Sequence, residues 1–207
     1  VVKIEELAFG RCSGLRGLLT LPSTLEYIGA AAFETCAFIG ELKLPDKLKY
    51  IGTQAFYSCK NFTGTLMLPE SLQYIGASAF HHCSGITGSL KIPQGITEIS
   101  SFAFYGGGFD GALIMHDGII AIGERAFGLC KFKGELNLPS KIFILEDEVF
   151  INCNFSGNLK LPQNLRSIGM SVFENNVRLS GILEFPPSVT SISAGAFARC
   201  GFEEIIF

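Results

Sequence analysis

Residues 68–83 read LPESLQYIGASAFHHC, and versions of this phrase return nine times along the 207-residue chain. The phenylalanine near the end of each copy is the clearest marker, and successive copies are 23 or 24 residues apart. These phenylalanines are Phe9, Phe33, Phe56, Phe80, Phe104, Phe127, Phe150, Phe173 and Phe197. A fixed period in this range is typical of a solenoid, in which each turn of chain stacks on the turn before it.

Apolar residues recur at set positions in every copy and predict the core. An aliphatic residue stands five residues before the phenylalanine in each turn, and another stands eight residues before it. A glycine then opens an alternating run such as GELKLP at residues 40–45, and this alternation predicts a half-buried strand that the proline ends. One turn buries too little apolar surface to offset the entropy of ordering its backbone. We therefore expect residues 1–207 to fold as a single domain.

The charge and composition of the chain exclude some classes of function. The formal net charge is −3 and the isoelectric point is about 5.7, so the chain has no basic excess with which to bind nucleic acid. No segment approaches the ~20 apolar residues of a membrane helix, so we expect no membrane insertion. The chain begins and ends within a repeat, without a signal peptide in this fragment. We therefore expect a fragment of a longer repeat protein.

The repeated positions resemble a known class of leucine-rich repeat. The slots that carry the resemblance are Leu68-Pro69, Leu72, Ile75-Gly76, Ala79-Phe80 and Cys83. They are similar to the BspA-like (Treponema pallidum-type) leucine-rich repeat surface proteins. The resemblance implies an α/β solenoid: a right-handed array of about nine turns, with a parallel β-sheet on the concave face and short strands, turns or 3-10 segments elsewhere. It also implies a secreted or cell-surface bacterial protein, often one that adheres to host proteins or other cells.

Seven cysteines stand three residues after a repeat phenylalanine, which places them in one column of the stack. They are Cys12, Cys36, Cys59, Cys83, Cys130, Cys153 and Cys200. Neighbouring strands lie ~4.8 Å apart, which would permit disulfides between turns. However, the column skips Gly107 and Asn176, and a buried thiol packs well as a small apolar group. We therefore predict free thiols that serve the core.

No arrangement of residues predicts catalysis or a bound cofactor. His81 and His82 precede Cys83, but adjacent residues of an extended segment point to opposite sides and would chelate one metal ion poorly. No catalytic triad, phosphate-binding glycine loop or pair of catalytic carboxylates is apparent. We therefore predict that the protein is not an enzyme and holds neither a metal nor a cofactor.

Tyrosines occupy one outward row in three consecutive turns. Tyr27, Tyr50 and Tyr74 each stand six residues before the repeat phenylalanine and should stack as an exposed ladder. Tyrosine is enriched at interfaces, so the ladder is a candidate site for a protein partner or a glycan. The alternative is that the stacked rings only stabilise the solenoid surface through cross-strand pairing.

Exposed apolar residues are expected in the middle of the array. Ile114 and Met115 interrupt an otherwise polar strand, and Ile120, Phe143 and Ile144 make the outward surface of the sixth and seventh turns apolar. An exposed apolar patch can mark a contact site. The partner could be another domain or a neighbouring copy, so self-association through the patch or end to end is a further expectation.

These observations predict a non-catalytic extracellular or cell-surface interaction module that functions in adhesion or in binding a host or partner protein. Two alternatives stay open. The array could be a structural spacer that presents another domain, or its repeat surface could bind glycans.

Overall fold

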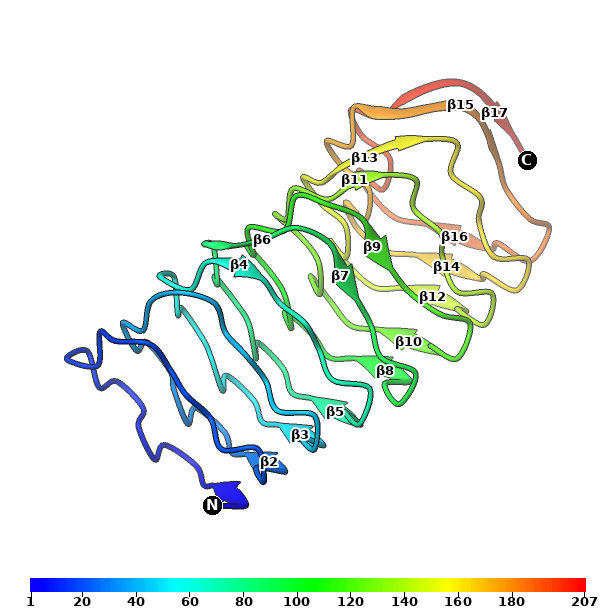
Figure 1. Cartoon of the computed structure of the whole chain (residues 1–207). Helices are drawn as coiled ribbons and strands as arrows, with labels where there is room; N and C mark the ends of the chain where they lie inside the picture. The colour runs from blue at the N-terminus through cyan, green and yellow to red at the C-terminus, as the bar shows by residue number, and fades with distance from the viewer.

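The computed structural model describes all 207 residues as one parallel β-solenoid of about nine stacked turns. The turns follow one another from the N-terminus at one end of the stack to the C-terminus at the other (Figure 1). Short strands lie on two different sides of the turns. On each side, they pair in parallel with the strands of neighbouring turns. No helix long and apolar enough to cross a membrane is present.

The first set of strands consists of two residues per turn, just before the repeated glycine. In every strand of this set but the last, the second residue is a buried aliphatic side chain; the first residue points outward. The strands are β1 (Lys3–Ile4), β2 (Tyr27–Ile28), β3 (Tyr50–Ile51), β5 (Tyr74–Ile75), β8 (Glu98–Ile99), β10 (Ala121–Ile122), β12 (Ile144–Leu145), β14 (Ser167–Ile168) and β16 (Ser191–Ile192). We call the outward side of these strands, with the residue that precedes each strand, the tyrosine face.

The second set of strands lies within the alternating leucine runs. Its members are β4 (Gly64–Thr65), β6 (Ile86–Thr87), β7 (Leu90–Lys91), β9 (Leu113–Ile114), β11 (Lys133–Gly134), β13 (Asn154–Gly157), β15 (Arg178–Glu184) and β17 (Gly201–Ile206). Isolated bridges such as Lys43 with Met67 continue the pairing between these strands. The strands expected in the leucine runs are therefore present, and we call their outward side the leucine face.

The expected α/β character and 3-10 segments are wrong, because the structure contains neither an α-helix nor a 3-10 helix. The chain around each repeat phenylalanine forms successive turns instead. Two residues per turn, two before and two after the phenylalanine, have positive φ; 16 of these are not glycine, and their φ values lie between 50° and 62°. A right-handed helix cannot continue through such residues.

In this segment, backbone amides alternate between two kinds of hydrogen bond: one amide donates to a carbonyl of the next turn, and the following amide donates to a carbonyl within its own turn. The amide of Phe80 donates to the carbonyl of Ala103 in the following turn (2.8 Å), whereas the amide of His81 donates back to Ser78 (3.2 Å). The same alternation recurs along the stack. Bonds between turns therefore offset the cost of the left-handed residues and set the spacing of the turns.

Glycine after the inward aliphatic residue allows adjacent turns to approach closely. A Cβ atom at Gly76 would lie 2.4 Å from the backbone nitrogen of Thr53 in the preceding turn. Ser100 occupies the same slot in the next turn, and its hydroxyl donates to the carbonyl of Ile75 (2.7 Å). A side chain is therefore accommodated in this slot where the local backbone permits it.

The core is a column of phenylalanine rings that runs the length of the stack. The nine repeat rings stack with centroids 5.2–5.8 Å apart. A second aromatic column meets these rings edge-on, as in the contact between Phe104 and Phe109. Seven of the nine repeat rings belong to a single cluster of 53 buried apolar residues, which forms one core along the stack. The rings of the two terminal turns are less buried: Phe9 is exposed, and Phe197 packs against the end of the cluster.

All seven cysteines are free, which confirms that part of the prediction, but only five of them are buried. Cys12 is exposed and Cys200 is half-buried, and both lie in terminal turns. From the second turn onward, each thiol donates to the carbonyl of the repeat phenylalanine one turn earlier, as Cys59 does to Phe33 (3.1 Å). The slot thus holds a small hydrogen-bond donor in every turn from the second onward except the fifth, where Gly107 occupies it.

Asn176 supplies the donor of this slot with an amide. Its Nδ2 donates to the carbonyls of Phe150 (2.8 Å) and Phe173 (3.0 Å), and the side chain is fully buried. Its Oδ1 has no hydrogen-bond partner. The substitution of asparagine for cysteine in this turn keeps the donor but leaves one buried acceptor unsatisfied.

We expect Asn176→Ala to lower the free energy of unfolding by about 1–3 kcal/mol, because it leaves the Phe150 carbonyl without its side-chain donor. Asn176→Cys should change stability by less than about 1 kcal/mol, because it restores a thiol donor and removes the unsatisfied Oδ1. Urea unfolding followed by circular dichroism measures both variants. Equal unfolding midpoints for the alanine and cysteine variants would show that the donor contributes nothing.

Candidate binding surface

The three tyrosines of β2, β3 and β5 form a continuous stacked ladder on the tyrosine face. Tyr27 pairs in register with Tyr50, and Tyr50 with Tyr74. The ring centroids are 4.6 Å and 4.7 Å apart, and the rings deviate from parallel by 10° and 13°. Burial of the middle ring, together with its two tyrosine neighbours, raises the pKa of Tyr50. The three rings therefore form one continuous row along the tyrosine face.

Stacking determines which part of each ring a ligand can reach. Both faces of Tyr50 are covered by its neighbours, and one face of Tyr27 is covered by Tyr50. The ammonium of Lys3 lies over the Tyr27 ring, 5.7 Å from its centroid. Edges and hydroxyls remain accessible, whereas a sugar ring has no face of Tyr27 or Tyr50 on which to stack. Along the ladder, only the outer face of Tyr74 is free for stacking.

The apolar residues of the sixth and seventh turns lie on the same face, beyond Glu98. Ile120 immediately precedes β10, Phe143 precedes β12, and Ile144 is the outward residue of β12. Each of the three is about half exposed, and the Arg166 guanidinium lies 6.0 Å from the centroid of the Phe143 ring. We call these three residues the apolar patch. The structure therefore brings six of the eight predicted site residues onto one face.

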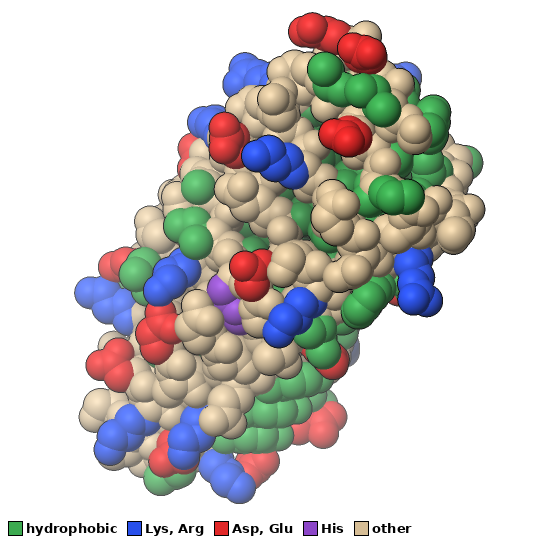
Figure 2. Space-filling model, turned by 90° about the vertical axis from the view of Figure 1, so that its right-hand side faces the viewer, with side chains coloured by type: hydrophobic (Ala, Val, Ile, Leu, Met, Phe, Trp, Pro, Cys, Tyr) green, Lys and Arg blue, Asp and Glu red, His purple; other side chains and the backbone are tan.

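The other two predicted residues are elsewhere. Ile114 is 48% exposed but belongs to β9 on the leucine face. Met115 follows it, points inward and packs against the core. These two residues therefore do not belong to the tyrosine face. Figure 2 shows hydrophobic side chains gathered on part of the surface, with acidic and basic side chains scattered between them.

A second aromatic stack lies beside the repeat phenylalanines and was not anticipated from the sequence. The rings of Tyr57, His81 and Tyr105 stack with centroids 4.8 Å and 5.2 Å apart. His82 and Phe102 pack against the edge of this stack. The signal was present, because the three stacked residues each follow a repeat phenylalanine directly.

This stack corrects the expectation for the two histidines. Their ring centroids lie 4.3 Å apart, because the segment is a turn and not an extended strand. Burial and the neighbouring His82 lower the pKa of His81 to about 4, and His81 Nδ1 has no hydrogen-bond partner. No group of three or more histidine, cysteine, aspartate or glutamate side chains gathers as a metal site would require. The two histidines therefore pack as aromatic rings, and the lowered pKa keeps His81 uncharged near neutral pH.

Arg125 packs against a ring at the edge of the second aromatic stack. The Arg125 guanidinium lies 5.5 Å from the centroid of the Phe102 ring, and its Nε donates to Glu148 Oε2 (2.9 Å). This ion pair raises the pKa of Arg125. Cations on aromatic faces thus recur in three places in the solenoid.

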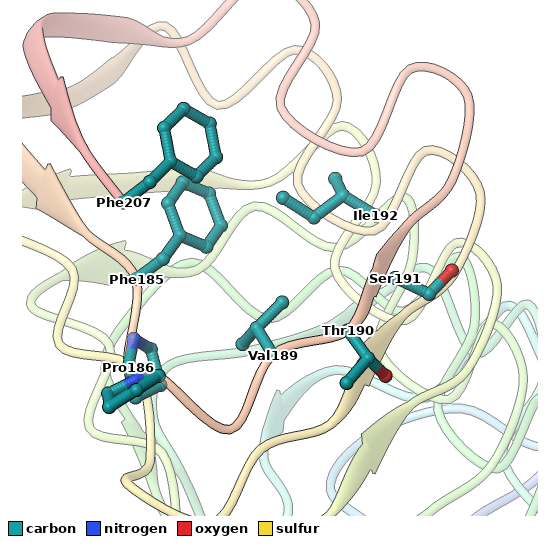
Figure 3. Close-up of a pocket in the computed structure, with 8 residues that line it drawn as sticks. Phe185, Pro186, Val189, Thr190, Ser191, Ile192 and Phe207 are labelled. Atoms are coloured by element: carbon teal, nitrogen blue, oxygen red, sulfur yellow. The ribbon is translucent and has the colours of Figure 1, made fainter.

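A hollow of about 450 Å³ opens at the last turn. Figure 3 shows the Phe185 and Phe207 rings side by side at one wall and Val189 and Ile192 at the other. Its only side-chain polar atoms are the hydroxyls of Thr190 and Ser191, so no ionisable group faces the space. The arrangement offers no acid, base or nucleophile beyond two ordinary hydroxyls.

The chain belongs to the BspA-type leucine-rich repeat family. The family model, described as a BspA type leucine rich repeat region, matches in six copies over residues 1–107 and 110–207. No curated protein matches the sequence. The assignment agrees with the repeat slots and with the free cysteine column.

Two solved structures share the fold. A leucine rich cell surface protein from Faecalibacterium prausnitzii A2-165 superposes with a TM-score of 0.56 at 19% identity. A leucine-rich repeat protein from Bacteroides ovatus ATCC 8483 superposes with a TM-score of 0.56 at 20% identity. In both cases the alignment covers 96% of this chain and 68% of the other. At this identity the similarity establishes the fold alone.

The lowered pKa of His81 predicts a pH dependence of stability. The unfolded histidine takes up a proton as the pH falls through 6.5, whereas the folded one resists protonation until about pH 4. The unfolded state therefore binds more protons in this window, and the free energy of unfolding should decrease as the pH falls from 6.5 to 4. His81→Phe keeps an aromatic ring in the stack and should make this decrease shallower.

The measurement is the melting temperature of both proteins across this pH range at constant ionic strength. The matched control is Tyr57→Phe, which removes only a hydroxyl from the same stack and should retain the wild-type slope. Parallel curves for wild type and His81→Phe would refute the assignment to His81.

Proposed function

We propose that the chain is a non-catalytic, extracellular or cell-surface interaction module that binds a protein partner through the tyrosine face. The observation that carries the proposal is the alignment of the tyrosine ladder and the apolar patch along one side of a rigid stack. Exposed aromatic and aliphatic side chains arranged in this way resemble the anchors of protein interfaces. Membership of the BspA-type family and the cell-surface description of one structural neighbour support a location outside the cell.

The state of the thiols supports a non-catalytic role. Burial raises the pKa of Cys59 and of Cys130 to about 12, and that of Cys200 to about 11. A catalytic cysteine instead has a lowered pKa and an accessible sulfur. The thiols also serve as hydrogen-bond donors between turns, which accounts for their repeated position without chemistry.

We further propose that the function is adhesion to a protein on a host or neighbouring cell. A solenoid offers a long surface whose outward residues can vary while the core slots are kept. The second candidate function is a spacer that presents another domain. The continuous phenylalanine column supports this candidate, because it makes the array a single rod-like unit.

The partner-binding proposal predicts that Ile144→Lys lowers binding at least ten-fold, because a charge would be buried where an apolar contact is lost. The matched control is Ile114→Lys. Ile114 is 48% exposed and Ile144 is 49% exposed, and both are outward strand residues, but Ile114 lies on the leucine face. The control should bind as wild type does.

The measurement uses purified chain on an array of extracellular-matrix and bacterial surface proteins, with glycans printed beside them. Retention by a protein spot, with loss in Ile144→Lys alone, supports the proposal. Loss in Ile114→Lys alone would move the site to the leucine face. Retention by glycans alone contradicts the proposal and supports glycan binding. Retention by no spot also contradicts the proposal and supports the spacer role.

A further inference from the structure

Three aromatic faces of this protein are covered by a cation from a neighbouring turn. Lys3 covers Tyr27, Arg125 lies over Phe102, and Arg166 lies over Phe143, with the charge 5.5–6.0 Å from the ring centroid in each case. A cation at this distance is attracted by the negative potential of the ring face. In the tyrosine ladder, Lys3 occupies the position that another ring would take one turn before Tyr27.

The opposite end of the ladder has no such cation. Tyr50 covers one face of Tyr74, and the ring makes no other aromatic or cation contact. Tyr74 is accordingly the most exposed of the three tyrosines, at 42%. The outward residue of the next turn is Glu98 in β8, which does not pair with β5, so the paired ladder stops at Tyr74.

Glu98 differs from the other carboxylates around the ladder. Glu26 pairs with Lys49 (2.8 Å) and Glu70 pairs with Lys91 (2.6 Å). Glu98 is exposed and forms no ion pair. The end of the ladder therefore combines an open aromatic face with an uncompensated negative charge one turn away.

We propose that Tyr74 and Glu98 form a subsite for an arginine or lysine side chain of the protein partner. A guanidinium could stack on the outer face of Tyr74 while its N–H groups donate to the Glu98 carboxylate of the following turn. Arginine fits better than lysine because its planar group can stack and form hydrogen bonds at the same time. The inference rests on the proposed function and specifies the chemistry of the partner at one end of the binding face.

The subsite can be tested without knowing the partner. The probe is the blocked tripeptide acetyl-Ala-Arg-Ala-amide, titrated into the full chain while NMR follows the tyrosine ring signals. The chain has only five tyrosines, so the Tyr74 signals can be assigned from single substitutions. The same peptide with citrulline in place of arginine keeps the shape and removes the charge.

The arginine peptide should shift the Tyr74 signals in a saturable way, and the citrulline peptide should not. Glu98→Gln and Tyr74→Leu should each weaken binding about two- to five-fold, the range typical of an exposed ion pair or cation–π contact. The matched controls lie outside the tyrosine face and should leave the affinity unchanged. Glu184→Gln changes an exposed carboxylate without an ion pair on the leucine face, and Tyr57→Phe changes a tyrosine of the second aromatic stack. Glu98 is an exposed surface residue, so its variant keeps the test valid if Tyr74→Leu folds poorly.

Equal shifts with the citrulline peptide, no shift at Tyr74, or equal weakening by the control variants would each overturn the subsite. This result is separate from the test of the proposed function. Peptide binding together with an empty protein array would leave a cation subsite on a protein whose proposed function is wrong. A partner retained through Ile144 without any effect of Glu98→Gln or of the peptide would leave the function without this subsite.

Discussion

The vertical register of the turns is the constraint on which the rest of the structure depends. Backbone amides around each repeat phenylalanine donate alternately within a turn and to the next turn, and these bonds hold equivalent residues above one another. Every slot of the repeat therefore becomes a column. The phenylalanine column, the thiol donors and the tyrosine ladder are three results of this one register. A substitution in one turn therefore alters the packing and hydrogen bonding of both adjacent turns, because each turn supplies hydrogen-bond partners to its neighbours.

The column of thiol donors shows how the register decides which substitutions are tolerated. The slot accepts only small residues, and in most turns the residue donates to a carbonyl of the preceding turn, as Cys59 does with its thiol. Asn176 donates with an amide and leaves its own oxygen unpaired. A column that looks like redox or metal chemistry in the sequence is thus explained by hydrogen bonding between turns. The same stacking that buries the thiols raises their pKa and reduces their reactivity.

The register also shapes the candidate binding face. Stacked rings protect one another, so the ladder exposes edges and hydroxyls along its length and one open ring face at Tyr74. At the two ends of the tyrosine ladder, Lys3 lies over Tyr27, whereas the outward residue of the turn after Tyr74 is the carboxylate Glu98. The two ends of the ladder are therefore chemically different. This difference follows from the first outward strand residue, which is Lys3 in the first turn and Glu98 in the fifth.

Much of the fold can be determined from the sequence alone, because the same pattern of apolar residues recurs nine times at intervals of 23 or 24 residues. The period, the inward slots, the strands of the leucine runs and the family follow from residues such as Leu72, Ile75 and Phe80. Only the tertiary structure shows that the segment around Phe80 is a series of turns and not a helix, since its left-handed residues, such as Ser78 and His82, are stabilised by bonds to other turns. Ring faces, ion pairs and the stack around His81 depend on side-chain directions within the columns. The spacing of residues along the chain does not specify these directions, so the stacking of the turns decided which surfaces remain open to a partner.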